Sequence, residues 1–534
     1  MRQKKKSRWA ADLSLSPPSS SSASASSSSS SSSSGDGGRD AGEKGVDDRL
    51  TELPDTVRLH ILSLLPLKYA IRTGALSSRW RALWRLRWPH PAALEFSPPT
   101  DLGDSAADEF VAGVDRCLSA RGLGRRIDAL FVALPPGRRY DADIKRWLEY
   151  AASCGVEDLS LVVSPLSLAA TSARPGRRAR RNDRAAVSSA FFFSISECSN
   201  LARLTISGLH LSSPSANIKR LSSLEVLSLQ AAHVTDAALR RIIAACPFLR
   251  SLDLCLCRKL RRIMITAASS RLTSLTIVGC VRALEVTISS AGLRRFRFSG
   301  NYLTTYSFDS PSRLEDVYIS SGSPVSSLPR SNWVKALGEL SNVKVLTLCN
   351  LSLQYIVAEG VKAIGEFRNF RNLRELQLLM GMMADDNLMD IYGFFRLCQC
   401  PRLEKLFVEL PTNMGDPFIE KYLVVSEEEP PEVDFEYLKI IKINSFKGHS
   451  NEIGLVKFLL GKAASLESLV MISPKELTGE QHNKNILDGF PDFLHFLRSQ
   501  LLSFARASVG AQIILSEHDD NKFSPTHWEV YSKA

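Results

Sequence analysis

The chain has 534 residues, 44% of them hydrophobic, and its 67 Lys and Arg against 56 Asp and Glu give a formal net charge of +11. It is too long for one compact core and too apolar to be disordered throughout. No window reaches the roughly 18 to 20 apolar residues of a membrane helix, and the basic start lacks the apolar stretch of a signal peptide, so we expect a soluble protein of the nucleus or cytoplasm that is not secreted and binds no membrane.

The excess positive charge is concentrated in three windows. Residues 1–49, 50–93 and 174–184 carry net charges of +2, +5 and +5, so the remaining 430 residues carry −1. Affinity for nucleic acid grows with the number of phosphates that a protein neutralises. Because most of the chain is close to neutral, we do not expect nucleic acid as a partner.

Residues 1–46 are predicted to be a disordered, Ser-rich basic tail. Fourteen of the sixteen residues from Ser19 to Ser34 are serine, and such a stretch cannot bury enough apolar surface to offset the entropy of ordering it. Two interpretations of the tail stay open. It is a phosphorylated or nuclear-targeting arm that begins at Lys4, or it is a variable solvated extension.

Residues 47–93 are predicted to form a module of three short helices. Pro54 stands at the start of the first helix, and Pro66 separates it from the second. In the third, tryptophans recur every four residues from Trp80 to Trp88 and share one side. A module of this size has more apolar side chains than it can bury alone. We therefore expect the tryptophan side to dock on the rest of the chain and the leucine-rich sides to meet another protein.

The residues of this module resemble an F-box. The likeness lies in Leu53-Pro54, in spaced aliphatic residues after them, and in the segment from Leu76 to Trp80, although Ser78 stands where many relatives have Cys. An F-box implies binding to a Skp1-type adaptor and, through it, to a cullin-RING ubiquitin ligase. By this resemblance the residues that form or support the adaptor-binding surface are Leu53, Pro54, Ile61, Leu62, Leu65, Leu76 and Trp80.

Residues 94–434 are predicted to form a leucine-rich-repeat solenoid. A pattern of apolar-x-x-apolar-x-apolar begins eleven times at steps of 21 to 35 residues, which is typical of such repeats. Each repeat contributes one parallel strand with its aliphatic side chains inward, and stacked neighbours bury them. We expect an α/β protein with a small three-helix F-box and a parallel concave sheet. The pattern begins at Leu201, Leu224, Leu249, Leu272, Leu293, Leu314, Val343, Leu373, Leu403, Leu438 and Leu466, with looser copies at Ile127 and Val156.

The segments that return from one strand to the next are predicted to differ along the solenoid. Residues 235–246 favour a helix with Thr235 or Asp236 as its N-cap. Between Leu249 and Leu314 the repeats are too short for a substantial helix, and strand-like segments occur at half the period. We expect strands on both sides of the solenoid there, with the second set starting near Leu260, Leu284 and Tyr302, and helices on the outer side elsewhere.

Residues 435–534 resemble the FBD-type region of plant F-box/leucine-rich-repeat proteins. The likeness rests on a strand, a turn at Phe446-Lys447-Gly448, a helix over Leu455–Leu460 and a further strand, and on the sequence HWEVY near the C-terminus. Terminal repeats that cap the solenoid explain the same residues, and the two interpretations are compatible.

Nothing in the sequence indicates an enzyme. The chain has no glycine-rich phosphate loop, no HExxH pair and no nucleophile elbow. The ten cysteines include no CxxC pair and no His partner at zinc-finger spacing, so we expect free thiols, no metal and no cofactor. The arginine-rich loop at residues 174–184 is either a nuclear localisation signal or a solvated excursion.

A target protein is expected on the concave face of the sheet. The candidate residues are Arg295, Arg297, Tyr318 and Gln377, because their positions alternate with the inward aliphatic ones. The same alternation turns Asp253, Thr276 and Thr347 outward.

Two hypotheses of function follow. In the first, the chain is the non-catalytic substrate receptor of an SCF (Skp1-cullin-F-box) E3 ubiquitin ligase. In the second, it is an interaction scaffold whose N-terminal helices only cap the solenoid. Exposed leucines on the first two helices would favour the receptor, and leucines buried against the repeats would favour the scaffold.

Overall fold

The structure is a computed structural model, and all of its described residues belong to one unit within residues 53–534. The predicted tail, the arginine-rich loop and Leu76 lie outside the described residues. Those are 53–65, 67–74, 80, 83, 93–98, 104–121, 126–134, 140–163, 186–187, 195–211, 220–266, 271–300, 305–308, 313–321, 340, 342–360, 370–412, 429–474, 493–520 and 522–527.

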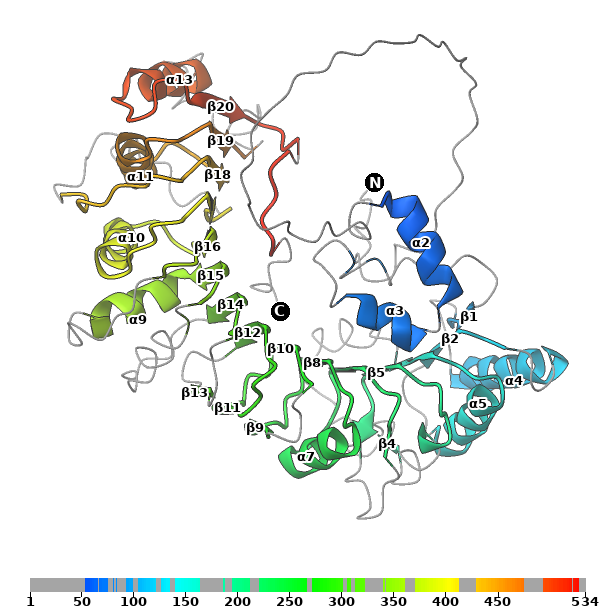
Figure 1. The fold of residues 1–534 in the computed structure, drawn as a ribbon. Helices are drawn as coiled ribbons and strands as arrows, with labels where there is room; N and C mark the ends of the chain where they lie inside the picture. The colour runs from blue at the N-terminus through cyan, green and yellow to red at the C-terminus, as the bar shows by residue number, and fades with distance from the viewer. Residues whose placement is uncertain are drawn as a thin grey trace, which may run out of the picture. The chain divides into compact units, whose positions relative to one another are not determined.

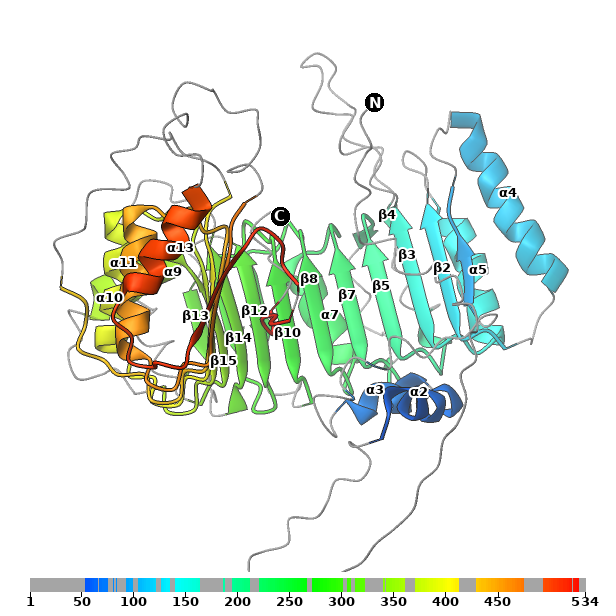
Figure 2. The ribbon, with the colours of Figure 1, turned by 90° about the horizontal axis from the view of Figure 1, so that it is seen from above.

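A parallel sheet of fifteen strands runs through the described part of the chain (Figures 1 and 2). Its strands follow one another in chain order, so each repeat pairs with the repeat before it and the repeat after it. This confirms the predicted α/β fold with a long parallel sheet. The strands are β1 (Ala93–Phe96), β2 (Ala129–Leu134), β3 (Asp158–Val163), β5 (Arg203–Ser207), β7 (Val226–Gln230), β8 (Ser251–Cys255), β10 (Ser274–Val278), β12 (Arg295–Gly300), β14 (Asp316–Ser321), β15 (Val345–Cys349), β16 (Glu375–Leu379), β17 (Lys405–Glu409), β18 (Ile440–Asn444), β19 (Ser468–Ile472) and β20 (Gln512–Ser516).

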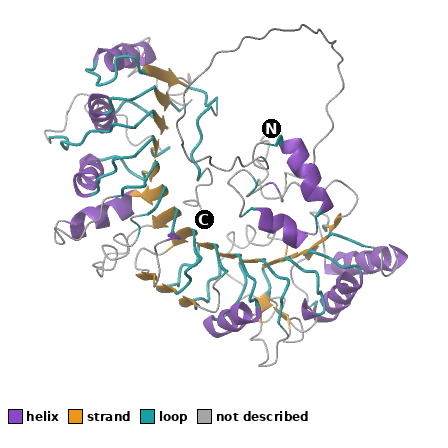
Figure 3. Ribbon diagram, viewed as in Figure 1, coloured by secondary structure: helices purple, strands orange, loops and turns teal. Residues whose placement is uncertain are grey.

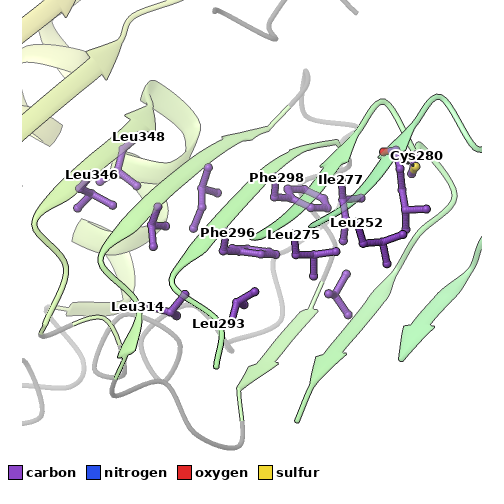
Figure 4. Close-up of a cluster of buried hydrophobic side chains, with 14 of the residues drawn as sticks. Leu252, Leu275, Ile277, Cys280, Leu293, Phe296, Phe298, Leu314, Leu346 and Leu348 are labelled. Atoms are coloured by element: carbon purple, nitrogen blue, oxygen red, sulfur yellow. Dashed lines mark hydrogen bonds between the residues drawn. The ribbon is translucent and has the colours of Figure 1, made fainter. Parts of the chain in front are cut away.

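In the register of the sheet, apolar side chains of one strand pair with apolar side chains of the next strand. Leu252 pairs with Leu275, Leu275 with Phe296, and Phe296 with Val317, and all four side chains are fully buried. Figure 4 shows three of these residues as neighbours in the core between the sheet and the segments behind it. Because the apolar side chains of each strand pack against those of the next strand, the core is continuous along the repeats.

Helices cover the outer face of the sheet over most of its length (Figure 3). They contribute apolar side chains to the same core cluster as the strands. The helices are α4 (Asp104–Arg121), α5 (Asp141–Ser153), α7 (Asp236–Ala245), α9 (Asn350–Gly360), α10 (Asp385–Leu397), α11 (Ser450–Lys462) and α13 (Phe493–Ser503).

Between α7 and α9 short strands take the place of helices on the outer side. The strands β9 (Arg262–Ile265), β11 (Glu285–Ile288) and β13 (Thr305–Phe308) form a second parallel sheet. This sheet confirms the strands predicted at half the period. Strands occur here because repeats of 21 to 25 residues leave no room for a long helix. A further pair, β4 (Ala186–Val187) and β6 (His210–Leu211), lies in an earlier repeat.

Helix α7 begins where the sequence predicts. The Thr235 side chain accepts a hydrogen bond from the Ala238 N–H at 3.3 Å, which confirms Thr235 as the N-cap. The neighbouring Asp236 carboxylate accepts from the backbone N–H groups of Arg261 and Arg262 at 2.9 and 3.2 Å. One side chain therefore connects this helix to the start of β9 in the next repeat.

The C-terminal region has the predicted strand, turn, helix and strand, formed by β18, α11 and β19, and the strand β20 extends the sheet. At the turn, Gly448 has a φ of +77°, and a Cβ there would lie 2.5 Å from Leu497 Cδ2. The Glu452 carboxylate accepts from the backbone N–H groups of Lys447 and Gly448 at 2.7 and 2.8 Å and of His449 at 3.3 Å. Burial nevertheless raises the pKa of Glu452 to about 6.

Candidate functional site

Two N-terminal helices, α2 (Asp55–Leu64) and α3 (Leu67–Thr73), dock on the sheet at the amino ends of β5 and β7. Figures 1 and 2 show both helices beside the strands at this edge. Leu62, Ala70 and Trp80 form a small apolar cluster with Ala202 and Val226 of the repeats. The predicted tryptophan side therefore contacts the solenoid at Trp80.

An ionic contact accompanies this apolar one. The Glu225 side chain, at the start of β7, is fully buried, and its two oxygens lie 2.5 Å from Arg72 Nε and 2.7 Å from Arg250 Nε. A buried carboxylate is costly unless charged partners surround it. Since one guanidinium comes from α3 and the other precedes β8, Glu225 links the helices to two consecutive repeats.

The opposite side of α2 faces solvent. Val57 and Leu64 are 42% and 72% exposed, and Tyr69 on α3 is 48% exposed. Pro54 is also exposed, and its spacing from Val57 and Leu64 places the three on one side of the helix. We name the side of α2 that carries Pro54, Val57 and Leu64 the exposed apolar face. Large apolar side chains gathered on a surface mark interaction sites.

The structure distributes the predicted adaptor-binding residues over both sides of the helices. Pro54 is exposed, and Leu53, Ile61 and Leu65 are half-buried. Leu62 and Trp80 are buried against the repeats. Leu64 and Tyr69 are exposed but are not among the residues that the F-box resemblance assigns to adaptor binding.

Three of the four predicted target-binding residues, Arg297, Tyr318 and Gln377, lie in one row across the sheet. The register joins Thr276 to Arg297, Arg297 to Tyr318, Tyr318 to Thr347, and Thr347 to Gln377. Arg295 lies two residues before Arg297 on β12. The two arginines are half-buried, whereas Tyr318 and Gln377 are 0% and 4% exposed.

The C-terminal segment, which we define as residues 517–520 and 522–527, contacts this row at Tyr318 and Thr347. It follows β20 and runs back along the concave side, where Figures 1 and 2 show it in red. His527 Nε2 lies 2.6 Å from Asp316 Oδ1, and His527 Nδ1 lies 2.6 Å from Thr347 Oγ1. The His527 ring also meets Tyr318 edge-on, with 5.6 Å between ring centroids. His527 therefore contacts two adjacent strands, β14 and β15.

Two more contacts hold the C-terminal segment on the sheet. The Thr526 N–H donates to Glu375 Oε1 at 2.5 Å. Lys442, on β18 and 3% exposed, donates from Nζ to both carboxylate oxygens of Asp519 at 2.7 Å and to the Phe523 carbonyl at 2.8 Å. The segment therefore pairs with charged groups on three strands, β14, β16 and β18.

The charges around Asp316 favour its ionised form. Burial acts to raise the pKa of Asp316, but the hydrogen bond and charge of His527, with the nearby Arg297 and Arg295, hold that pKa below its ordinary value. Arg297 Nη2 lies 4.0 Å from the second Asp316 oxygen. This arrangement suits recognition of a polar segment.

Among the described residues, no group of three His, Cys, Asp or Glu side chains could hold a metal ion. No helix within the described ranges is long and apolar enough to cross a membrane. All ten cysteines are free thiols, and Cys117 is the exposed one.

Comparison with known proteins agrees with this architecture. A family model described as the At1g61320/AtMIF1 LRR domain matches residues 129–487. The chain belongs to this leucine-rich-repeat family. A model of the F-box domain matches residues 50–91. In this chain an F-box therefore precedes the leucine-rich repeats.

The F-box/FBD/LRR-repeat protein At3g14710 of Arabidopsis thaliana is 22% identical over 479 residues, which cover 88% of this chain and 94% of that protein. The F-box/LRR-repeat protein At3g03360 of the same plant is 26% identical over 400 residues, covering 71% and 74%. With an FBD-associated F-box protein of that plant, At1g61330, the match is 24% identical over 278 residues and spans 50% of this chain and 62% of the relative. Among solved structures, an internalin of Listeria monocytogenes aligns over 53% of this chain and 74% of its own at 14% identity, with a TM-score of 0.19.

Proposed function

We propose that this F-box/leucine-rich-repeat protein is the substrate receptor of an SCF ubiquitin ligase. In this role the F-box binds a Skp1-type adaptor, the adaptor joins the chain to a cullin-RING ligase in the nucleus or cytoplasm, and the repeats bind a target protein. The chain itself is a non-catalytic adaptor subunit. It accelerates ubiquitin transfer only by bringing the target close to the conjugating enzyme.

The observation that carries this proposal is the exposed apolar face. Val57, Leu64 and Tyr69 remain in solvent although Leu62, on the other side of α2, is fully buried against the repeats. A helix that only capped the solenoid would turn its apolar side inward and a polar side outward. The uncovered apolar residues are the type of surface that a second protein buries.

A second function, an interaction scaffold without a ligase role, is favoured by a different observation. Leu62 and Trp80, which the F-box resemblance assigns to adaptor binding, pack against Ala202 and Val226. In a scaffold these contacts would be the purpose of the helices. The two functions differ in whether an adaptor binds the exposed apolar face.

The test is co-purification of the full chain with a Skp1-type adaptor. Replacing Leu53 and Pro54 by Ala is expected to abolish co-purification while the repeats stay folded, because these residues lie at the start of α2 and outside the docked cluster. The matched control replaces Met382 and Val509, exposed apolar residues of the repeats, by Ala and should leave co-purification unchanged. Retention of the adaptor by the Leu53/Pro54 variant would contradict the assigned binding surface, and absence of co-purification with the unchanged chain would favour the scaffold.

A further inference from the structure

The concave face between β14 and β18 carries an unusual set of buried charges. Asp316, Glu375 and Lys442 are 6%, 7% and 3% exposed. They lie on strands that contribute aliphatic side chains to the core, but they belong to the opposite, outward side. Groups from the C-terminal segment satisfy each of them. These residues are buried because the segment covers them.

Four groups of the C-terminal segment make polar contacts with the sheet. They are the Asp519 carboxylate, the Phe523 carbonyl, the Thr526 N–H and the His527 ring, which also meets Tyr318 edge-on. If the segment leaves, water can hydrate the charges that it covered. The buried side chains of Tyr318, Cys349 and Leu379 form the apolar part of the same face. Polar contacts of this kind are far easier to exchange for those of another ligand than apolar packing would be.

The C-terminal segment also has the form of a bound peptide. None of its described residues lies in a helix or strand, and its contacts reach from Lys442 on β18 to Asp316 on β14. Two of these contacts use backbone groups, which any sequence offers. The other two use side chains, a carboxylate at Asp519 and an imidazole at His527, and these give the surface its selectivity.

We propose that the concave face of β14–β18 is a binding site for an extended peptide, and that the C-terminal segment is its internal, displaceable occupant. The ligand class is an extended segment that presents a carboxylate to Lys442 and, eight residues later, an imidazole between Asp316 and Thr347. The inference rests on the proposed function in one respect, since it names the surface and the ligand class by which the receptor would hold a target. Binding of the peptide to the concave face requires no adaptor.

Covalent attachment gives the C-terminal segment an advantage over any free competitor. A tethered ligand has a local concentration in the millimolar range, so a separate peptide of equal intrinsic affinity binds weakly to the full chain. A substitution that weakens the internal segment must therefore increase the affinity for the separate peptide. This reciprocal effect distinguishes an exchangeable ligand from a fixed structural element.

The experiment measures binding of a fluorescent synthetic peptide with the sequence of residues 515–530 to the full-length chain by anisotropy. The His527→Ala chain is expected to bind the peptide at least about tenfold more tightly than the unchanged chain does. The control is the His518→Ala chain, because His518 lies exposed in the same segment and should leave binding weak. A peptide with His527→Ala should bind none of these chains.

A second pair of variants acts at the other end of the segment. It keeps the test valid if the His527→Ala chain does not fold. Asp519→Asn should increase peptide binding by removing the partner of Lys442, whereas Asp520→Asn, at an exposed neighbour, should not. Equal binding of the peptide by the His527→Ala, Asp519→Asn and unchanged chains would overturn the inference. Because the adaptor takes no part, this result is independent of the co-purification test above.

Discussion

His527 Nε2 lies 2.6 Å from Asp316 Oδ1, although 211 residues separate the two in sequence. This contact fastens the C-terminal segment to the middle of the solenoid, on the face where a target protein is expected. The concave surface is therefore formed in part by residues that no repeat contains. Five measurements test this account.

The His527 contacts are expected to stabilise the covered face. His527→Ala removes the hydrogen bonds to Asp316 and Thr347 and leaves a buried carboxylate without its imidazole, which should lower the free energy of unfolding by about 1–3 kcal/mol. Hydrogen exchange should accelerate at residues 522–527 and in β14 and β15. His518→Ala should change neither quantity. Unchanged exchange in His527→Ala would show that the contact does not hold the segment.

The docking of the F-box helices depends on Glu225. Arg72→Ala leaves this buried carboxylate with Arg250 alone and should cost about 1–3 kcal/mol, less than for a fully buried pair because Arg72 is 31% exposed. Faster hydrogen exchange in α2 and α3 should accompany the loss. The control is Arg374→Ala, which breaks the exposed pair with Glu404 and should cost about 0–1 kcal/mol. Equal effects of the two substitutions would contradict an anchoring role for Arg72.

Acid should stabilise the turn at Gly448 through Glu452. Its pKa is raised from 4.5 to about 6 by burial, so between these values the folded chain binds more protons than the unfolded chain. The free energy of unfolding should therefore fall as pH rises from 4.5 to 6, by on the order of 2 kcal/mol for this group.

Glu452→Gln should remove this contribution, which urea denaturation at pH 4.5 and pH 6.5 would measure. Asp390 also has a pKa raised to about 6, by burial and by the charge of Asp386, so part of the slope should remain. Asp390→Asn combined with Glu452→Gln should reduce it further. A slope that is identical in the unchanged chain and the double variant would refute the assignment.

The thiols should differ sharply in reactivity. Burial raises the pKa of Cys198, Cys246 and Cys398 to about 12, whereas Cys117 lies exposed on α4 and Cys255 is half-buried. A thiol reagent at neutral pH should therefore modify one cysteine rapidly in the folded chain. Cys117→Ser should abolish this rapid modification. Rapid modification of several cysteines in that variant would show that the other thiols are not buried as described.

The repeating part of the fold could be predicted because its information is local and periodic. The pattern that starts at Leu249 places Leu252 and Leu254 inward, and the same spacing predicts each later strand. Short repeats likewise predicted the outer strands β9, β11 and β13, since chain length alone excludes a helix there. The Thr235 cap was visible because capping uses adjacent residues.

The two surfaces were less predictable because they depend on contacts between distant parts of the chain. Helical spacing groups Val57 with Leu64 and separates them from Leu62, but it does not say which side meets the repeats. Strand alternation turns Tyr318 and Gln377 outward, but it cannot show that His527 of the C-terminal segment packs against Tyr318. Neither Asp519 nor His527 belongs to any period, so no sequence pattern linked them to the sheet.

The measurement that most directly tests the proposed receptor role is calorimetric titration of a purified Skp1-type adaptor into the full-length chain. The account predicts a one-to-one complex with the unchanged chain and with a Met382→Asp and Val509→Asp control. It also predicts at least about a hundredfold weaker binding when Val57 and Leu64 are both replaced by Asp, because a charge would have to be buried at the interface. Absence of binding by the unchanged chain, or equal affinity in the Val57/Leu64 variant, would contradict the claim that the exposed apolar face binds the adaptor.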